Sequence, residues 1–366
     1  MILHVYFARK FLITCLGLTT VLFALTSLME FIDLLRDFGG FDGVGFWQVV
    51  ELMFLKSPAT IDQILPLILL LSTIGLFLNL ARTSEMVVTR ASGRSAVRAL
   101  IAPICVALLI GTVAVSALGP IVAASSNKFS SLTENYRSGG SAILSVSNEG
   151  LWLRQGDTDG QTVIRASRSN ADGSILYDVT FLSYEPDGGP VRRLQAESAA
   201  LNVGFWSLQK VKEWPLEHGG NPEAQAKLHE TFQLNSSLTL ERIRESLGTF
   251  SGVSVWDMPD FILQLEQAGF SAQRHKVWFQ KELSRPLFLI AMVLVGAAFT
   301  MRHTRLGGTG MSVVSAVLLG FTMYFAHSFA TILGENGQLA VHLAAWAVPV
   351  AANLLALGLL LHSEDG

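Results

Sequence analysis

The chain has 366 residues, of which 50% are hydrophobic and 15% are charged, and its formal net charge is −3 at neutral pH. Soluble domains carry about 25% charged residues, so this composition argues against a wholly soluble protein. No basic block suggests a nucleic-acid partner, and the two cysteines, Cys15 and Cys105, lie in apolar stretches, which argues against a disulfide framework.

Six apolar stretches near the two ends of the chain are long enough to predict membrane-spanning helices, each of which needs about 20 apolar residues. They cover residues 11–29, 61–80, 99–118, 286–301, 310–333 and 341–361. The fourth stretch is short, so we expect it to extend into its flanks. The first stretch lacks a small-residue cleavage pattern where it ends, so we interpret it as a membrane helix rather than a signal peptide.

The short loops predict the orientation of these spans, because lysine and arginine accumulate on the cytoplasmic side. On one side lie Arg9 and Lys10 before span one, Arg82, Arg90, Arg94 and Arg98 after span two, and Arg302 and Arg305 after span four. On the other side, the loop after span one has only Arg36 and Lys56, and the loop at 334–340 has neither lysine nor arginine. We therefore expect both termini in the cytoplasm and the polar middle of the chain outside it.

The first cytoplasmic loop, between spans two and three, contains the segment "SEMVVTRASGRSAVRAL". Its arginines recur at multiples of four positions and would form one stripe on a helix. Such a helix can lie on the membrane with its arginines against anionic lipids, or it can dock into a partner. Gly93 permits a close approach or a sharp bend, and Glu85, near the helix start, can accept a hydrogen bond from a partner.

The polar middle of the chain is rich in short β-type pieces between about residues 142 and 232. Segments such as "AILSV", "GLWLR", "TVIRAS" and "ILYDVTFLSY" alternate with turn signals such as Asp172-Gly173. This spacing predicts a β-sandwich or jelly roll, with Trp152 and Trp206 in its core. Such a domain can be self-sufficient, or its open sheet edges can accept a strand from another protein.

Two helical segments follow the β-type pieces. Residues 240–250 have a helical pattern, and Asp257-Met258-Pro259 predicts the start of a helix that runs to Gly269. Residues 271–283 then approach span four, with Trp278 expected near the lipid headgroups.

Several motifs resemble one family. "SEMVVTRASG" looks like the coupling-helix motif of the LptF/LptG family, the permeases of the lipopolysaccharide-export ABC transporter. "FIDLLRDF", "NYRSGG", "GLWLRQGD" and "QRHKVWFQKELSRPL" resemble the family in the same order. The order and spacing together are specific, and the G subunit is the closer match, because "ELVVMQASG"-type and "GLW" motifs are similar to its pattern.

The resemblance implies a fold and a location. The fold class is an α-helical polytopic membrane protein with six transmembrane helices, arranged 3+3, and an inserted all-β periplasmic jelly-roll domain. We expect residues 1–120 to hold spans one to three, with a coupling helix at 83–94. Residues 121–250 would form the β domain, and residues 251–366 the connecting helices and spans four to six. The chain would lie in the bacterial inner membrane.

The resemblance also implies a function. The chain would be a non-catalytic permease that extracts lipopolysaccharide from the inner membrane and passes it to a periplasmic bridge. Its partners would be a paralogous LptF-like permease, a cytoplasmic LptB-like ATPase dimer, a bitopic LptC-like protein and an LptA-like bridge. The chain has no GxxxxGK[ST] phosphate loop, so ATP hydrolysis is expected in another chain.

Two other functions are open to a chain of this kind. The first alternative is a membrane-anchored periplasmic scaffold or assembly protein without transport. The second, an intramembrane lipid-modifying enzyme, lacks a cluster of acid, base or metal ligands in its spans. We expect no cofactor and no metal, because His229-Glu230 lacks the second histidine of a HExxH zinc motif.

The resemblance implies two sets of candidate site residues. Those for coupling to the ATPase are Glu85, Met86, Val87, Arg90, Ala91, Ser92 and Gly93. Those for binding lipid phosphates are Arg36 and Arg137, although Arg36 can also be a helix end that snorkels to the interface. Glu30, Asp37 and Glu134 fall where other members can carry basic residues, and they would repel phosphate unless a cation bridges them.

Span five carries two further candidates. Gly308, Ser312, Ala316 and Gly320 recur at intervals of four and permit close helix packing, either against the paralogue or within the chain's own bundle. His327 is an ionisable group inside the span, which is either functional or a neutral histidine hydrogen-bonded to a neighbouring helix.

Overall fold

The computed structural model describes residues 2–39, 44–91, 96–138, 144–147, 150–157, 160–170, 174–185, 189–216, 222–236, 238–239, 253–267, 270–301 and 309–365. The chain divides into two compact units. The helical unit joins Met1–Leu132, Ser251–Val255 and Gln273–Gly366, and the β unit joins Thr133–Phe250 and Trp256–Ala272.

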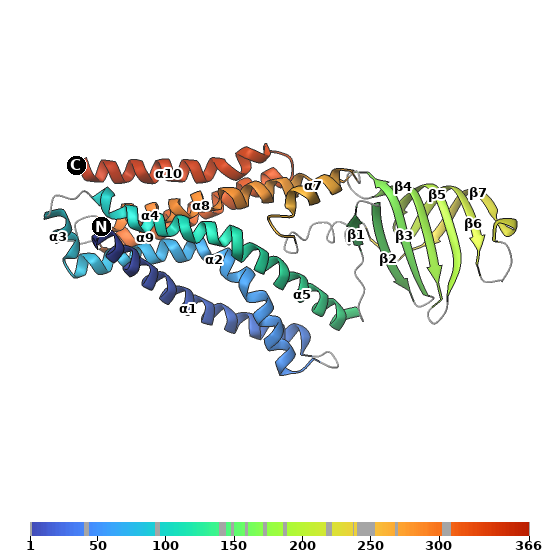
Figure 1. The fold of residues 1–366 in the computed structure, drawn as a ribbon, viewed down its shortest axis with the longest axis horizontal. Helices are drawn as coiled ribbons and strands as arrows, with labels where there is room; N and C mark the ends of the chain where they lie inside the picture. The colour runs from blue at the N-terminus through green and yellow to red at the C-terminus, as the bar shows by residue number, and fades with distance from the viewer. Residues whose placement is uncertain are drawn as a thin grey trace. The chain divides into compact units, whose positions relative to one another are not determined.

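Within the described residues, the helical unit has six helices that are long and apolar enough to cross a membrane. They are α1 (Ile2–Phe38), α2 (Phe46–Arg82), α4 (Ala96–Val113) with its continuation, α8 (Gln273–Thr300), α9 (Thr309–Glu335) and α10 (Val341–Asp365), labelled in Figure 1. The continuation of α4 is a π-helical turn, η1 (Ala114–Leu118), followed by α5 (Gly119–Ser138). These helices contain five of the six predicted stretches in full and the fourth, 286–301, up to Thr300, and α8 begins well before residue 286, as expected for this short stretch.

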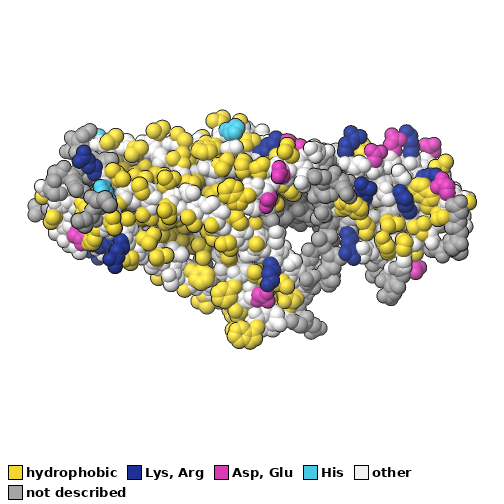
Figure 2. Space-filling view, viewed as in Figure 1, with side chains coloured by type: hydrophobic (Ala, Val, Ile, Leu, Met, Phe, Trp, Pro, Cys, Tyr) yellow, Lys and Arg dark blue, Asp and Glu magenta, His cyan; other side chains and the backbone are white. Residues whose placement is uncertain are grey.

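The helices differ in how deeply they are buried. The most apolar window is 67% buried in α8 and 61% buried in α2, but only 17% buried in α1 and in α9. Gly296 lets α8 approach α2 closely, because a Cβ there would lie 3.0 Å from the carbonyl oxygen of Leu70. The visible face of the helical unit is mostly hydrophobic, with charged side chains near its ends (Figure 2). The helices α2 and α8 therefore form the core of the unit, and α1 and α9 present apolar faces outward.

The described strands of the β unit form one antiparallel seven-stranded sheet whose strands follow chain order. They are β1 (Leu144–Ser147), β2 (Gly150–Asp157), β3 (Gly160–Ser169), β4 (Ile175–Tyr184), β5 (Pro190–Asn202), β6 (Phe205–Pro215) and β7 (Lys227–Asn235). A short 3₁₀ helix, η2 (Pro222–Gln225), precedes β7. The structure thus confirms a helical membrane protein with an inserted β domain, and it gives the β domain a meander topology.

One face of the sheet forms the core of the β unit. Leu153, Ile164, Phe181 and Leu194 lie directly opposite one another on four consecutive strands, and each is at most 1% exposed. Trp206 is fully buried beside them, as predicted. The prediction for Trp152 is wrong, because alternation along β2 places it on the outer face, where it is 36% exposed.

The sheet curls around this core. The side chain of Gln155, in β2, donates a hydrogen bond to the backbone oxygen of Asn235, at the end of β7, across 3.1 Å. The Ser236 hydroxyl donates to Gln155 Oε1 across 2.8 Å. Strands that are far apart in the sheet order therefore meet on its inner side.

One of the two predicted connecting helices lies among the described residues. It is α7 (Met258–Gln267), which belongs to the β unit and buries Met258, Ile262 and Leu265. The other, predicted at 240–250, lies outside the described residues.

Candidate functional site

A short helix, α3 (Glu85–Ala91), follows α2 at the end of the helical unit that holds both chain termini (Figure 1). The last turn of α2 closes with a hydrogen bond from the Thr83 N–H to the Asn79 carbonyl at 3.0 Å. Ser84 then adopts a φ of 59°, in the left-handed region, which turns the chain away from α2. The Val88 N–H donates to the Ser84 carbonyl at 3.2 Å, which begins the new helix.

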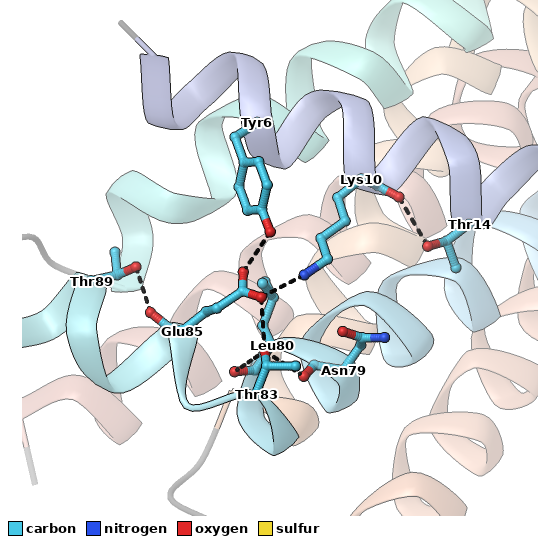
Figure 3. Close-up of polar contacts among 8 residues, drawn as sticks. All are labelled: Tyr6, Lys10, Thr14, Asn79, Leu80, Thr83, Glu85 and Thr89. Carbon is cyan, nitrogen blue, oxygen red and sulfur yellow. Dashed lines mark hydrogen bonds and ion pairs between the residues drawn. The ribbon is translucent and has the colours of Figure 1, made fainter.

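The carboxylate of Glu85 is the centre of a polar network (Figure 3). Lys10 Nζ of α1 donates to Glu85 Oε1 across 2.8 Å, and Tyr6 Oη of α1 donates to Glu85 Oε2 across 2.9 Å. Thr83 Oγ1 donates to Oε1 across 2.9 Å. The backbone carbonyl of Glu85 accepts from Thr89 Oγ1 across 2.8 Å, which steadies the first turn of α3.

The network holds Glu85 in its ionised form. The hydrogen bond from Lys10 is the largest cause that lowers the pKa of the Glu85 carboxyl below its usual value; burial opposes it, and the hydrogen bonds from Tyr6 and Thr83 lower the pKa further. The side chain of Glu85 is 31% exposed. Because a carboxylate has about four lone-pair sites and three are occupied here, Glu85 can still accept a hydrogen bond from outside the chain.

The other described side chains of α3, which include the predicted coupling residues Met86 and Ala91, divide between a buried and an exposed side of the helix. Met86 and Thr89 are buried and fasten the helix to the bundle. Val88 is 68% exposed, and Ala91 is exposed at the end of the helix. Among the side chains of α3 that the structure describes, those that face outward besides Glu85 are thus small and apolar, which suits docking into a groove.

The remaining predicted coupling residues are described less fully. The backbones of Val87 and Arg90 belong to α3. Ser92 and Gly93 lie outside the described residues.

Sequence analysis did not single out Tyr6 or Thr83, and it used Lys10 only to predict orientation. Lys10 directly follows Arg9 at the start of span one, where the sequence alone predicts only a pair of basic residues on the cytoplasmic side. Nothing in the local sequence identifies Glu85 as a partner of Lys10, since the two residues are 75 positions apart.

The predicted lipid-binding residues lie near helix ends. Arg36 is exposed in the last turn of α1, and the backbone of Arg137 belongs to the last turn of α5. Glu30 is buried and accepts a hydrogen bond from Thr60 of α2, so its carboxylate faces the chain's own bundle. Asp37 is exposed beside Arg36.

The small residues predicted as an interface on α9 face inward where they are described. Ala316 is fully buried, and a Cβ on Gly320 would lie 2.3 Å from a methyl group of Leu70 in α2. Ser312 is half-buried, and Gly308 lies outside the described residues. The structure therefore packs Ala316 and Gly320 within the chain's own bundle, which was one of the two interpretations left open.

The opposite side of α9 carries large exposed apolar residues. They are Met311, Val314, Leu318, Phe321, Phe325, Phe329 and Ile332. Their spacing of three or four positions forms one continuous stripe along the helix. The exposed stripe, rather than the small residues, is the side of α9 available to lipid or to another chain.

His327, also in α9, is buried and stacks on Phe288 of α8, with the ring centroids 4.5 Å apart. This packing is typical of a neutral histidine. Among the described residues, no group of three or more His, Cys, Asp and Glu side chains could hold a metal ion.

Comparison with known proteins identifies the family. The sequence profile of the family described as "Lipopolysaccharide export system permease LptF/LptG" matches residues 5–362. Lipopolysaccharide export system permease protein LptG of Haemophilus influenzae is 22% identical over 333 residues, which is 90% of this chain and 89% of that protein. LptG of Escherichia coli K12 is 24% identical over 336 residues, which is 88% of each chain. The match spans both the helical unit and the β unit, and the chain therefore belongs to the LptF/LptG family of lipopolysaccharide export permeases.

Proposed function

We propose that this chain is the G-type permease subunit of an ABC transporter that extracts lipopolysaccharide from the inner membrane. ATP hydrolysis in a separate nucleotide-binding dimer drives the extraction. A paralogous F-type permease completes the transmembrane part, and a bitopic protein and a periplasmic bridge take up the lipid. The observation that carries this proposal is the family match over residues 5–362, which leaves almost no part of the chain for an unrelated activity.

In this proposal, α3 is the coupling helix, and the end of the bundle that holds both termini is cytoplasmic. The outward side of α3, with Val88, Ala91 and the remaining lone pairs of Glu85, fits a groove on the ATPase. A donor in that groove, such as an arginine, pairs with the Glu85 carboxylate, which the network keeps ionised. The buried Met86 ties α3 to its own bundle, so that α3 and the bundle move together.

The paralogue and the lipid occupy the outer faces of α1 and α9. Both helices expose large apolar side chains along their length, which supports this placement because such faces need lipid or protein against them. The contact with the paralogue involves the exposed stripe of α9, opposite Ala316. Arg36, in the last turn of α1, and Arg137, in the last turn of α5, meet the lipid phosphates. Because the Glu30 carboxylate is directed into the chain's own bundle, it does not oppose this contact.

Substituting Glu85→Lys tests the coupling role. We expect the variant to lose co-purification with the ATPase and to lose lipopolysaccharide-stimulated ATP turnover. Glu51→Lys is the matched control, because Glu51 also forms an ion pair with a lysine, Lys128, at 3.1 Å, but lies far along α2 from α3. Glu85→Gln preserves the shape of the side chain and separates loss of charge from misfolding. If Glu85→Lys retains both the ATPase and the stimulation, α3 is not the coupling helix, and the scaffold function becomes the better account.

A further inference from the structure

Docking of α3 to an ATPase would explain the exposed residues of α3, but it does not explain why residues of α1 contact the inward side of Glu85. Two of the three donors to the Glu85 carboxylate, Tyr6 and Lys10, come from α1, which is remote in sequence (Figure 3). The Lys10 ammonium also lies 5.2 Å from the centre of the Tyr6 ring, so that the two α1 side chains support one another. α3 is joined to α1 through its first residue, as well as to α2 by the chain.

The contact between Lys10 and Glu85 is short and partly shielded from solvent. Lys10 and Glu85 are 25% and 31% exposed, and their 2.8 Å distance is that of a charge-assisted hydrogen bond. The turn of α1 that carries Lys10 has an additional hydrogen bond, because Thr14 Oγ1 donates to the Lys10 carbonyl across 2.9 Å. This hydrogen bond stiffens the turn. A movement of Glu85 therefore pulls on a regular part of α1.

α1 is also one of the two spanning helices whose most apolar windows are the least buried, at 17%. It packs on α2 and α4, while its other side exposes a long apolar face. Members of this face include Val5, Ile13, Leu16, Val21, Leu25, Leu28 and Ile32. Moving α1 changes its packing on α2 and α4 along one side only, whereas moving the deeply buried α2 or α8 would disrupt the core.

We propose that Lys10 and Tyr6 are positioning residues that transmit the movement of α3 to α1, so that α1 shifts relative to α2 when the coupling helix is displaced. This inference rests on the proposed function, since the displacement comes from nucleotide binding in the ATPase. Glu85 then has two roles at once: its outward lone pairs engage the ATPase, and its inward hydrogen bonds hold α1.

The test removes the inward contacts and leaves Glu85 in place. Lys10→Met and Tyr6→Phe are introduced, singly and together, into the complete transporter in lipid nanodiscs that contain lipopolysaccharide. Lys10→Arg keeps the charge and serves as the rescue, and Lys128→Met removes a lysine from an exposed ion pair elsewhere in the chain as the control. Three quantities are measured: co-purification with the ATPase, ATP turnover, and lipopolysaccharide released per ATP hydrolysed.

We expect the Lys10→Met and Tyr6→Phe double variant to co-purify normally and to hydrolyse ATP, but to release about tenfold less lipid per ATP, the effect of losing about 1.4 kcal/mol of coupling. Lys10→Arg should recover most of the loss, and Lys128→Met should show none. A movement of α1 can be followed with a single cysteine at the exposed position Val21, in a chain with Cys15 and Cys105 replaced by Ala. The rate at which this cysteine reacts with a thiol reagent should change when ATP is added. This change should disappear in the double variant.

Two results would overturn the inference. Unchanged release per ATP in the double variant would mean that α1 does not receive its movement through these residues. Loss of co-purification together with ATP turnover would mean that Lys10 and Tyr6 only shape the docking surface. Failure of the proposed function itself is distinguishable, because the unmodified chain would then fail to bind the ATPase or to release lipid at all.

Discussion

Arg285 of α8 forms an ion pair with Asp62 of α2, with Nη2 and Oδ2 2.7 Å apart, inside the helical unit. The same guanidinium donates to the backbone carbonyl of Asp62 at 2.6 Å and to Glu282 Oε2 at 2.8 Å. The three side chains are between 11% and 19% exposed. One arginine thus joins the two helices that form the core of the unit and neutralises charge in an apolar environment.

Replacing Arg285 should therefore be among the most destabilising changes in the spans. Arg285→Leu removes the cation that contacts both the Asp62 and Glu282 carboxylates, and breaking a buried pair in this way costs about 3–5 kcal/mol. Lys128→Leu, at the exposed pair with Glu51, should cost no more than about 1 kcal/mol. Thermal unfolding in detergent measures both. Equal effects of the two substitutions would show that the Arg285 cluster contributes no more than a surface pair.

A second prediction concerns the close approach of α4 and α8. A Cβ on Gly111 would lie 2.7 Å from Cα of Pro286, which is backbone and cannot rotate away. Gly111→Ala should lower stability by about 1–3 kcal/mol through overpacking. Gly358→Ala is the matched control, because Gly358 is also helical but has no atom within 4 Å of the added Cβ. Both changes gain the same helix propensity, so opposite signs of the two shifts in unfolding temperature are expected. A stabilising Gly111→Ala would contradict the observed contact.

The sequence was sufficient to predict the helices and the kind of domain inserted between them. Hydropathy locates the spans well because each needs a long apolar run, and the turn signals bracket the strands. It could not give the strand order or the curl of the sheet, since pairing depends on residues such as Gln155 and Asn235, which meet only in three dimensions. The core position predicted for Trp152 is wrong because an aromatic side chain in a strand favours burial, whereas the alternation set by the buried Leu151 and Leu153 directs it to the outer face.

The candidate site was only partly visible in the sequence. Glu85 and the helix around it follow from a local motif and a turn. The residues that hold Glu85 do not, because α1 approaches α3 through packing that no local pattern encodes. The spacing of the small residues on α9 predicts close helix packing but does not say which helix packs there. Such a stripe suits a helix of another chain and a helix of the same chain equally, and here the neighbour is Leu70 of α2.

The Glu85 network predicts a dependence on pH. The pKa of Glu85 is lowered from its usual 4.5 in the folded chain, chiefly by the hydrogen bond from Lys10. A depressed pKa means that the contact contributes its full stability above the usual value and loses it as the pH falls through the folded value. The difference in unfolding temperature between the unmodified chain and Glu85→Gln should therefore be constant at neutral pH and shrink in acid, below pH 4.5.

The control for this measurement is the partner residue. In a Lys10→Met background, the same Glu85→Gln comparison should give a smaller difference at neutral pH, because the hydrogen bond that lowers the pKa is gone. Glu51→Gln should show no comparable effect. A difference between the unmodified chain and Glu85→Gln that stays unchanged well into acid would show that the charge on Glu85 is not what stabilises the contact.

The last prediction addresses how the β unit keeps its curl. Gln155→Leu retains the size of the side chain but leaves the Asn235 carbonyl and the Ser236 hydroxyl without their partner, at a cost of about 1–3 kcal/mol. The loss should be local: amide hydrogens of β7, at one edge of the sheet, should exchange faster with solvent, while those of the central strand β4 keep their protection. Gln195→Leu is the matched control, because Gln195 is exposed on the outer face of β5. Equal exchange rates for β7 in the two variants would mean that the sheet closes through its apolar core alone, since Leu194, Phe181 and Trp206 remain in place in both.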